Sequence, residues 1–376
     1  MTRRGLLMGA AATSLLPFAG GSNANAGEAK SMRYTALALQ TVCEAVNQDK
    51  TPEASHARMK GAIARVTGQI MASKNFLKGF NGYDLKLVVL PEYWMTGFPM
   101  GETRESWQAK AAIPMDGAFP EALAKMAQTA GVYLCSNHYE TDPNFPELYF
   151  QSNVIYGPTG ETLLRYRRMI SLYSPSPYDV WEKYLDIYGA DAVFPVVETE
   201  IGALATIASE EILYPEIARM SAFKGAEILL HPTSEVGSPG LTPKHIAKKA
   251  RAIENIAYVV SANSAGITGT PVPAASTDGM SIVLDWYGRT LAEAGTGETM
   301  NANAVLDLTA LRETRRKTGM TNTLSRLPLA AFAPAYAGNE MAPANRTPDG
   351  KMVQRADALA QQQAVIDRLV SAGVLK

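Results

Sequence analysis

The chain of 376 residues is 47% apolar and 19% charged, which is enough to bury a large core in one large domain or two ordinary ones. Its 35 basic and 36 acidic side chains give a formal charge of -1 and are mixed along the chain. No basic field therefore indicates nucleic-acid binding, and no tract is polar enough to be disordered. A small molecule is the better candidate for a partner.

The first residues have the features of a cleaved export signal. The pair Arg3-Arg4 precedes an apolar run, and the small-residue sequence Ala24-Asn25-Ala26 follows that run. The run is too short to span a bilayer comfortably, and the paired arginines are typical of twin-arginine signals. We therefore expect residues 1–26 to be removed during export to the periplasm. An uncleaved membrane anchor is the alternative.

Apolar periodicity divides the rest of the chain into alternating strands and helices. We expect strands at 34–41, 85–90, 131–136, 202–208, 226–230, 258–263 and 304–308, hairpins at 153–166 and 281–292, and helices at 55–73, 119–130, 247–256 and 352–370, with another helix from Pro215. Strands and helices that alternate but are broken by hairpins indicate two layers of sheet between layers of helix, rather than one purely parallel sheet.

The end of the chain is expected to lie outside the main domain. The body is predicted to be complete near Leu308, and a loop rich in Ala and Pro follows. The last helix carries an apolar stripe that we expect to pack on its own domain or on a sister subunit. The stripe consists of Val353, Leu359, Ile366 and Leu369.

Chemistry is concentrated between residues 202 and 219. A strand of small apolar residues ends at Ala208, the polar run Ser209-Glu210-Glu211 follows, and Pro215 opens a helix. Ser209 therefore lies at the tip of a buried strand and faces the start of a helix, where α/β proteins usually place their reactive groups. The alternatives for this serine are a turn residue that bonds its own backbone, a pocket-lining residue and a nucleophile.

This stretch resembles the nucleophile segment of the carbon-nitrogen hydrolases, the superfamily of nitrilases and aliphatic amidases. Glu211, Tyr214-Pro215-Glu216 and Arg219 match the family's pattern, whereas Ser209 stands where the family has a cysteine. Three more stretches follow the family's order: Leu90-Pro91-Glu92-Tyr93 with Thr96-Gly97-Phe98, Tyr166-Arg167-Arg168, and Ala250-Arg251-Ala252-Ile253-Glu254-Asn255 with Ala262-Asn263. Each stretch is weak alone, but four in this order are specific.

The resemblance, from Tyr34 to about Leu308, implies a four-layer α-β-β-α sandwich whose subunits assemble in pairs. We expect a carbon-nitrogen hydrolase domain over 27–335 and a C-terminal extension over 336–376. The resemblance also implies a homodimer or a higher homo-oligomer that acts on a small-molecule substrate.

In the family, a glutamate takes the thiol proton and later activates water, the cysteine attacks the nitrile or amide carbon, and a lysine holds the developing oxyanion. The resemblance places Glu92 at the glutamate, Arg168 at the lysine and Ser209 at the cysteine. These three residues are our candidate catalytic set. The candidate substrate-binding residues are Tyr93, Trp94, Glu211 and Tyr214.

The family adds a second glutamate downstream of the lysine, and its equivalent is ambiguous here. Asp179 and Glu182 are candidates, although neither has the family's spacing, and Glu211 occupies the family's acidic position. For Glu210 we favour a solvated or helix-start charge.

Two cysteines and four scattered histidines give no metal-ligand spacing, so we expect neither a metal nor another cofactor. Cys43 and Cys135 each fall in a strand-like apolar run, where a buried free thiol is commoner than a disulfide.

Replacing the thiol with a hydroxyl changes the energetics of attack. A hydroxyl is several pKa units less acidic than a thiol, so at ~1.4 kcal/mol per unit its anion costs on the order of 5 kcal/mol more to form. Arg168 cannot donate a proton, but its fork of donors fits an oxyanion or a carboxylate.

Two functions remain open. The first is an exported hydrolase that acts on a small amide, nitrile-type or related acyl substrate, and the second is an inactive homologue that binds a small ligand or serves as a scaffold in the periplasm. Ser209 could also have been introduced in the laboratory in place of a cysteine. The second change, at Arg168, argues against this origin, because such a replacement would not need it.

Overall fold

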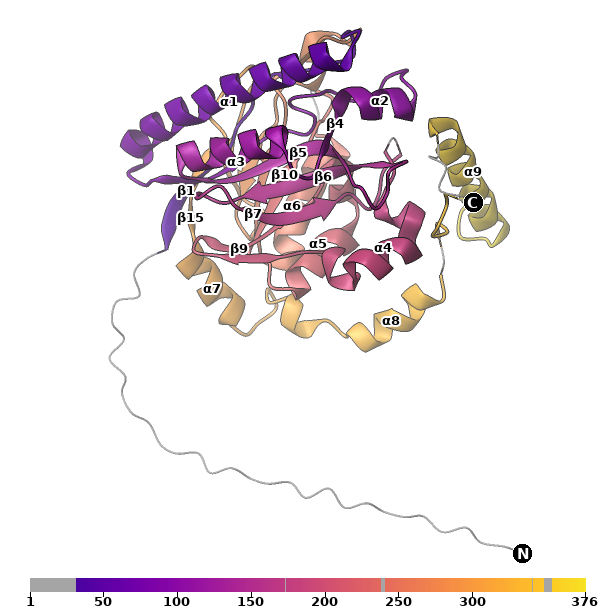
Figure 1. Cartoon of the computed structure of the whole chain (residues 1–376). Coiled ribbons are helices and arrows are strands. Elements are labelled where there is room, and N and C mark those ends of the chain that lie inside the picture. Colours follow the sequence, from indigo (N-terminus) through magenta and orange to yellow (C-terminus); the bar gives the residue numbers. More distant parts are fainter. Residues whose placement is uncertain (1–31, 173, 238–240, 340, 348–353) are drawn as a thin grey trace, which may run out of the picture. The chain divides into compact units, whose positions relative to one another are not determined.

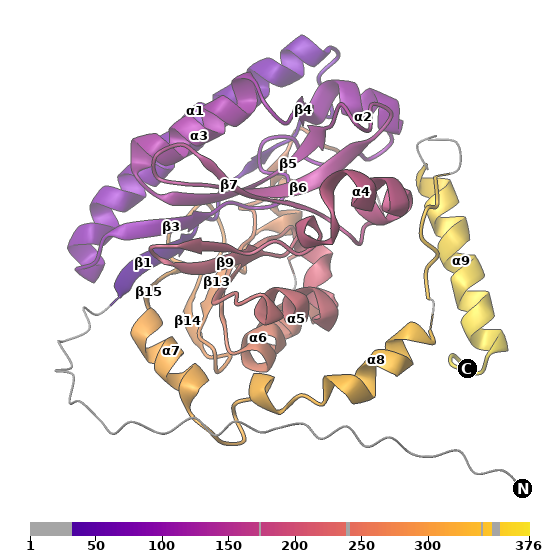
Figure 2. The ribbon, with the colours of Figure 1, turned by 60° about the horizontal axis from the view of Figure 1, so that its bottom comes forward.

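The computed structural model describes residues 32–172, 174–237, 241–339, 341–347 and 354–376. The expected export signal at 1–26 lies outside the described residues. Two large sheets pack face to face, and helices cover both outer faces (Figures 1 and 2). This arrangement is the expected four-layer α-β-β-α sandwich.

The first sheet has seven strands in the order β15-β1-β3-β5-β6-β7, with β4 beside β5. These strands are β1 (Arg33–Ala38), β3 (Leu85–Val89), β4 (Ala112–Pro114), β5 (Tyr133–Thr141), β6 (Tyr149–Tyr156), β7 (Thr162–Arg167) and β15 (Asn303–Asp307). Neighbours β1, β3 and β5 are parallel, whereas β6 and β7 continue the sheet as an antiparallel hairpin. The outer face is covered by α1 (Pro52–Asn81) and α3 (Ala118–Ala130), with α2 (Arg104–Ala111) nearby.

The second sheet has six strands in the order β14-β13-β11-β10-β9-β8. These are β8 (Val197–Thr199), β9 (Gly202–Thr206), β10 (Ile228–Pro232), β11 (Tyr258–Ala262), β13 (Ile282–Leu284) and β14 (Thr290–Glu293). Because β9, β10 and β11 are parallel, their carboxyl ends meet at one edge. Helices α5 (Pro215–Phe223) and α6 (Pro243–Asn255) cover this sheet, and β2 (Cys43–Glu44) pairs with β12 (Ile267–Thr268) in a separate ribbon.

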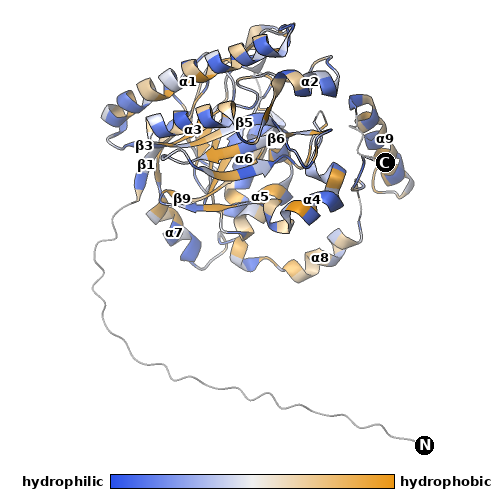
Figure 3. Ribbon diagram, viewed as in Figure 1, coloured by the Kyte–Doolittle hydropathy of each residue, from blue (hydrophilic) through white to orange (hydrophobic). Residues whose placement is uncertain are grey.

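The core lies between the two sheets. Every residue of β9, β10 and β11 is buried, and these strands share one apolar cluster with Ala36 and Leu87 of the first sheet. Figure 3 shows apolar residues on the strands and polar residues on the exposed sides of the helices. Each fully buried aliphatic side chain contributes roughly 1.5–3 kcal/mol, so this core fixes the strand ends that carry the polar residues described below.

Two stretches fold differently from our expectations. We expected no helix between the hairpin at 153–166 and the strand at 202–208, but η1 (Pro177–Val180) and α4 (Trp181–Tyr188) lie there. We also expected the body to end near Leu308, but α7 (Leu308–Arg316) continues it. Leu308 and Leu311 are buried, and Arg312 donates two hydrogen bonds to Glu227, at 2.6 and 2.8 Å. Periodicity missed α7 because only Leu308 and Leu311 of its 9 residues are buried.

Helix α8 (Leu329–Ala337) spans the expected boundary between domain and extension, and α9 (Arg355–Ser371) lies in the extension, close to the expected helix at 352–370. Leu359 and Ile366 of the predicted stripe are 43% and 36% exposed, whereas Ala358 of the same helix is buried, so packing on its own domain also stays a prediction. Val353 lies outside the described residues. Packing on a sister subunit stays a prediction. No helix in the described part of the chain has the length and apolar character needed to cross a bilayer.

Candidate active site

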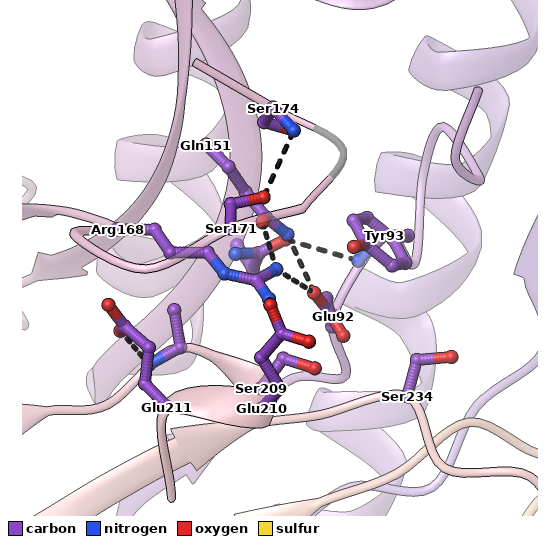
Figure 4. Close-up of polar contacts among 12 residues, drawn as sticks. Glu92, Tyr93, Gln151, Arg168, Ser171, Ser174, Ser209, Glu210, Glu211 and Ser234 are labelled. Carbon is purple, nitrogen blue, oxygen red and sulfur yellow. Dashed lines mark hydrogen bonds and ion pairs between the residues drawn. The ribbon is translucent and has the colours of Figure 1, made fainter. Parts of the chain in front are cut away.

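Polar side chains from both sheets meet where their strands end. Glu92 follows β3, Arg168 follows β7 and Ser209 follows β9. Their exposed fractions are 1%, 3% and 4%, respectively. Figure 4 shows the three side chains in one region, with Gln151 of β6 and Glu210 beside Arg168. The structure therefore brings together all three residues that the sequence predicted as catalytic.

Arg168 organises two carboxylates. Its Nη1 donates to Glu92 Oε1 at 3.1 Å and to Gln151 Oε1 at 2.6 Å, and its Nη2 pairs with Glu210 Oε1 at 2.5 Å. Its Nε donates to the backbone oxygen of Ile170 at 2.7 Å. Burial opposes the charge of Arg168, but the surrounding anionic groups outweigh it, so its pKa lies above its usual range. The hydrogen bonds thus come from Nε and Nη1, and Nη2 contacts Glu210 in an ion pair.

Glu210 lies in the first turn of a short helix, as one of our two alternatives stated, and it also has a partner that we did not expect. Its carboxylate is 32% exposed and turned inward, where it forms the ion pair with Arg168. Glu210 belongs to a short 3-10 turn, η3 (Ser209–Leu213), that begins directly at Ser209. The sequence pattern did not reveal this turn, so it did not reveal that the residue after Ser209 faces the site.

Glu211 holds the two sheet edges together. Its side chain is 0% exposed, and burial raises its pKa to about 7, against the opposing charge of Arg168. Both oxygens are occupied, which does not favour the direct substrate contact that we expected and indicates a positioning role. The four donors are Met169 N (2.7 Å), Ile170 N (3.0 Å), Tyr166 Oη (2.8 Å) and Ala208 N (3.1 Å).

Ser209 has a strained backbone that its neighbours hold in place. Its φ of 49° lies in the left-handed region, which costs a non-glycine residue roughly 1–3 kcal/mol. His231 Nε2 lies 2.8 Å from the carbonyl oxygen of Ser209, and His231 Nδ1 lies 2.8 Å from Ser261 Oγ. A carbonyl only accepts, so Nε2 carries the hydrogen and Nδ1 accepts from Ser261. Burial lowers the pKa of His231 to about 3, so this imidazole is neutral and anchors the backbone of Ser209 rather than its hydroxyl.

The hydroxyl of Ser209 has a partner that sequence reasoning missed. Lys244 Nζ donates to Ser209 Oγ at 3.0 Å and to the backbone oxygen of Ser234 at 3.1 Å. Among the described residues, Lys244 rather than Glu92 lies within hydrogen-bond distance of this hydroxyl. We had begun the helix at Ala247, whereas α6 begins at Pro243, with Thr242 as its N-cap. A Thr-Pro pair is a helix-start signal, so it was the available clue to this lysine.

The model of the carbon-nitrogen hydrolase family matches residues 41–316. The chain belongs to this family. This carbon-nitrogen hydrolase is 26% identical to a formamidase of Pseudomonas syringae pv. syringae over 261 residues, 69% of this chain and 70% of the relative. It is 27% identical to a nitrilase of Pyrococcus abyssi over 212 residues, 56% of this chain and 74% of the relative. A nitrilase and fragile histidine triad fusion protein, NitFhit of Caenorhabditis elegans, is 25% identical over 225 residues, 59% of this chain but only 49% of that longer protein.

Solved structures support the fold. A carbon-nitrogen hydrolase from Helicobacter pylori G27 superposes with a TM-score of 0.61 at 22% identity, covering 81% of this chain and 98% of that chain. An amidase from Nesterenkonia sp. gives a TM-score of 0.52 at 20% identity, covering 81% and 96%.

The remaining predicted residues of this carbon-nitrogen hydrolase divide between core and surface. Trp94 is 0% exposed and donates from Nε1 to Ser136 Oγ at 3.1 Å, so it belongs to the core and not to a pocket wall, contrary to our expectation. Tyr93 is 9% exposed, stacks on Tyr139 and adjoins Glu92, with a left-handed φ of 59°. Tyr214 is 41% exposed beside η3 and marks, with Glu210, the side on which the site meets solvent.

The two acids considered downstream of Arg168 do not join it. The Asp179 carboxylate is occupied by Ser176 and Arg346, and Glu182 starts α4. Within the described residues, the acid that accompanies Glu92 is Glu210.

The two cysteines cannot take over the role of nucleophile. Both are buried and unpaired. Burial raises the pKa of each to about 12, so neither forms a thiolate near neutral pH. Among the described residues, no group of three or more His, Cys, Asp or Glu side chains is arranged to hold a metal ion.

Proposed function

We propose that this carbon-nitrogen hydrolase cleaves an amide or related acyl bond of a small substrate through an acyl-enzyme on Ser209. One observation carries the proposal: Ser209 is held in a strained backbone conformation after β9, and its hydroxyl accepts a hydrogen bond from Lys244. Glu92, Arg168 and Glu210 lie beside it (Figure 4). A turn serine with no chemical role would have no need of such strain, which clusters at functional sites.

The reaction has two halves. Ser209 Oγ attacks the acyl carbon and the amine leaves, and water then hydrolyses the acyl-serine. Glu92 is the proposed base for that water, because Gln151 Nε2 and Arg168 fix its Oε1 at 2.8 and 3.1 Å. The guanidinium of Arg168 is the proposed donor to the oxyanion. The low exposure of the cluster supports a small substrate.

The experiment is a screen of short amides, nitriles and esters with purified residues 27–376, followed by intact and peptide mass spectrometry. We expect product and an acyl mass on Ser209. Ser209→Ala should lose both, with activity falling at least about 10³-fold. Ser221→Ala, which removes a buried hydroxyl of α5 distant in sequence from the site, is the matched control. A wild type that gives neither product nor adduct across the panel would reject the proposal.

A second candidate function is ligand binding without turnover. It is favoured by the lack of a Glu92–Ser209 hydrogen bond among the described residues, since the family's glutamate acts on its nucleophile directly. In that case a bound ligand should raise the melting temperature, with about 2.7 kcal/mol of stabilisation at a hundredfold excess over Kd. Arg168→Ala should abolish the shift without loss of fold, and mass spectrometry should find the ligand unchanged.

We also propose twin-arginine export, supported by the pair Arg3-Arg4 and the sequence Ala24-Asn25-Ala26. Cell fractionation should find the mature chain in the periplasm, and replacing both arginines with lysine should leave the full-length precursor in the cytoplasm. Recovery of an uncleaved, membrane-bound chain would favour the anchor instead.

Assembly into a homodimer or a larger homo-oligomer is proposed from the apolar side chains that stay exposed on the second helical layer and on α9. They include Leu213, Phe223, Ile246, Ile253, Leu359 and Ile366. Light scattering coupled to size-exclusion chromatography tests this, and a monomeric mass at micromolar concentration would contradict it.

A further inference from the structure

We propose that Lys244 accepts the proton of Ser209, so that the reactive unit of this enzyme is a serine-lysine pair. The inference rests on the acyl transfer proposed above and names the residue that activates its nucleophile. It assigns a catalytic role to a residue that lies outside the four stretches on which the family resemblance depends.

Lys244 is fixed at both ends. Its backbone lies in the first turn of α6, where Thr242 Oγ1 accepts a hydrogen bond from His245 N at 3.1 Å and donates one to Glu235 Oε2 at 2.9 Å. Its amine is held by the carbonyl oxygen of Ser234 at 3.1 Å and reaches Ser209 Oγ at 3.0 Å. The lysine nitrogen and the serine oxygen are therefore at a separation that general-base catalysis requires, and in the free-amine form of Lys244 the hydroxyl donates along the same line.

The other groups near Ser209 are already committed. His231 donates a hydrogen bond to the carbonyl oxygen of Ser209. Arg168 stays charged and accepts no proton. Glu210 is paired with Arg168, and Glu92 Oε1 holds Arg168 and Gln151. Lys244 is the described group that contacts the hydroxyl itself.

A second lysine, one turn along α6, shows why Lys244 is suited to the role. Lys248 is 0% exposed, and burial lowers its pKa although its amine contacts the carboxylate of Glu235. The hydrogen bonds of Lys244 go instead to two neutral oxygens. No carboxylate among the described residues lies within ion-pair distance of Lys244, so its amine is not held in a salt bridge as that of Lys248 is.

The step balances without a further reactant. As Oγ bonds to the acyl carbon, the O–H bond breaks, its proton moves to the free amine of Lys244 and the carbonyl π electrons move to the oxygen. When the tetrahedral centre collapses, the C–N bond breaks and the ammonium returns that proton to the leaving nitrogen. An amine is a far stronger base than a carboxylate, so the pair offsets the poor acidity of the hydroxyl that takes the thiol's place.

The test measures two rates in the mature protein: labelling of Ser209 by a small alkyl fluorophosphonate, which needs no carbon-nitrogen substrate, and turnover of the best amide. Lys244→Met should lower both rates 10²- to 10⁴-fold. Lys244→Arg keeps the charge but accepts no proton, so it should lower them equally. Lys249→Met, on the same helix, should leave both unchanged. Circular dichroism confirms that each variant is folded.

A cysteine background isolates the proton transfer. In Ser209→Cys, Lys244→Met should cost less than about tenfold, because a thiol with a pKa of ~8.5 needs little help. An equally large loss of rate in both backgrounds would mean that Lys244 only supports the structure of the site. This result would contradict the proposal that Lys244 accepts the proton. Full activity in Lys244→Arg would also overturn it, since charge alone would then suffice.

The outcomes separate this inference from the proposed function. If amides are hydrolysed and Ser209 is labelled at unchanged rates in Lys244→Met, Lys244 is not the base for Ser209, and the proposed acyl transfer remains supported. If labelling depends on Lys244 but no substrate in the panel is hydrolysed, the pair stands and the proposed reaction fails. Absence of labelling and turnover in the wild type overturns both.

Discussion

Two cationic side chains reach the polar cluster around Ser209 from opposite sheets, and their surroundings differ. Arg168, after β7 of the first sheet, is 3% exposed and ion-paired with Glu92 and Glu210. Lys244, at the start of α6 over the second sheet, is half-buried and hydrogen-bonded to neutral oxygens. The comparison teaches that the site separates two tasks: one cation holds carboxylates in place, and the other is left able to exchange a proton.

The largest expected effect is on the Arg168 side. Arg168→Met leaves the buried carboxylate of Glu92, and the part-exposed one of Glu210, without their cation, so the free energy of unfolding should fall by about 3–5 kcal/mol. Urea unfolding at pH 7 measures it. Arg289→Met, which removes an ion pair whose arginine is 68% exposed, should change stability by less than about 1 kcal/mol. Similar losses in the two variants would erase the distinction drawn above.

On the Lys244 side of the site, the buried His231 should make the free energy of unfolding depend on pH. Burial lowers its pKa to about 3 in the folded protein, whereas an unfolded histidine titrates near ~6.5. Below pH 6.5 the unfolded chain therefore binds a proton that the folded chain does not. Stability is fully present above this pH and falls by about 1.4 kcal/mol per unit on acidification, about 2 kcal/mol at pH 5.

His231→Gln removes this titration while keeping a donor for the carbonyl oxygen of Ser209. Urea titrations at pH 7, 6 and 5 should show the wild type losing stability relative to the variant as pH falls. Because other groups titrate in both proteins, the difference between the two curves is the quantity to compare. Parallel curves would show that the pKa of His231 is the same in the folded and the unfolded chain, and would contradict the prediction.

A smaller effect is expected at Glu210. Glu210→Gln weakens an ion pair with a carboxylate that is 32% exposed, so solvent screening limits the loss of stability to about 0.5–1 kcal/mol. Turnover should fall more than stability does, because Arg168 would then be held by Glu92 alone among carboxylates. Unchanged kcat/KM would mean that Glu210 is a bystander.

The smallest effect on stability is expected for Lys244→Met, within about 0.5 kcal/mol of the wild type, because the apolar stem is kept and no ion pair is broken. Thermal unfolding measures it. Set beside the loss of turnover expected for this variant, the result would separate function from folding on this side of the polar cluster. A loss above about 2 kcal/mol would indicate a structural lysine.

The sequence predicted most strands, and also the strand ends that carry the site residues, because buried parallel strands have unbroken apolar runs in their sequence. It also predicted Glu92, Arg168 and Ser209, since each follows such a run or matches a family motif. Trp94 was assigned to the pocket by its neighbourhood in sequence, although its side chain points into the core. Alternation along one strand does not say which layer of a sandwich a residue after that strand will face.

Glu210 and Lys244 were missed for different reasons. The inward turn of Glu210 depends on the left-handed backbone of the preceding serine, which local propensity disfavours. Lys244 lies 35 residues beyond Ser209, and only the packing of α6 on the second sheet brings the two together. Contacts between elements of this kind carry no periodic signal.

The division of the polar cluster between the two sheets has a consequence for how the protein acquires activity. Glu92 and Arg168 come from one layer, and Ser209, His231 and Lys244 from the other, so neither half contains a working centre. A refolding chain should recover its secondary structure first and its reactivity toward the fluorophosphonate last, when the layers close on each other. The rate at which Ser209 regains its reactivity would then measure the rate of the last folding step, the packing of the two sheets.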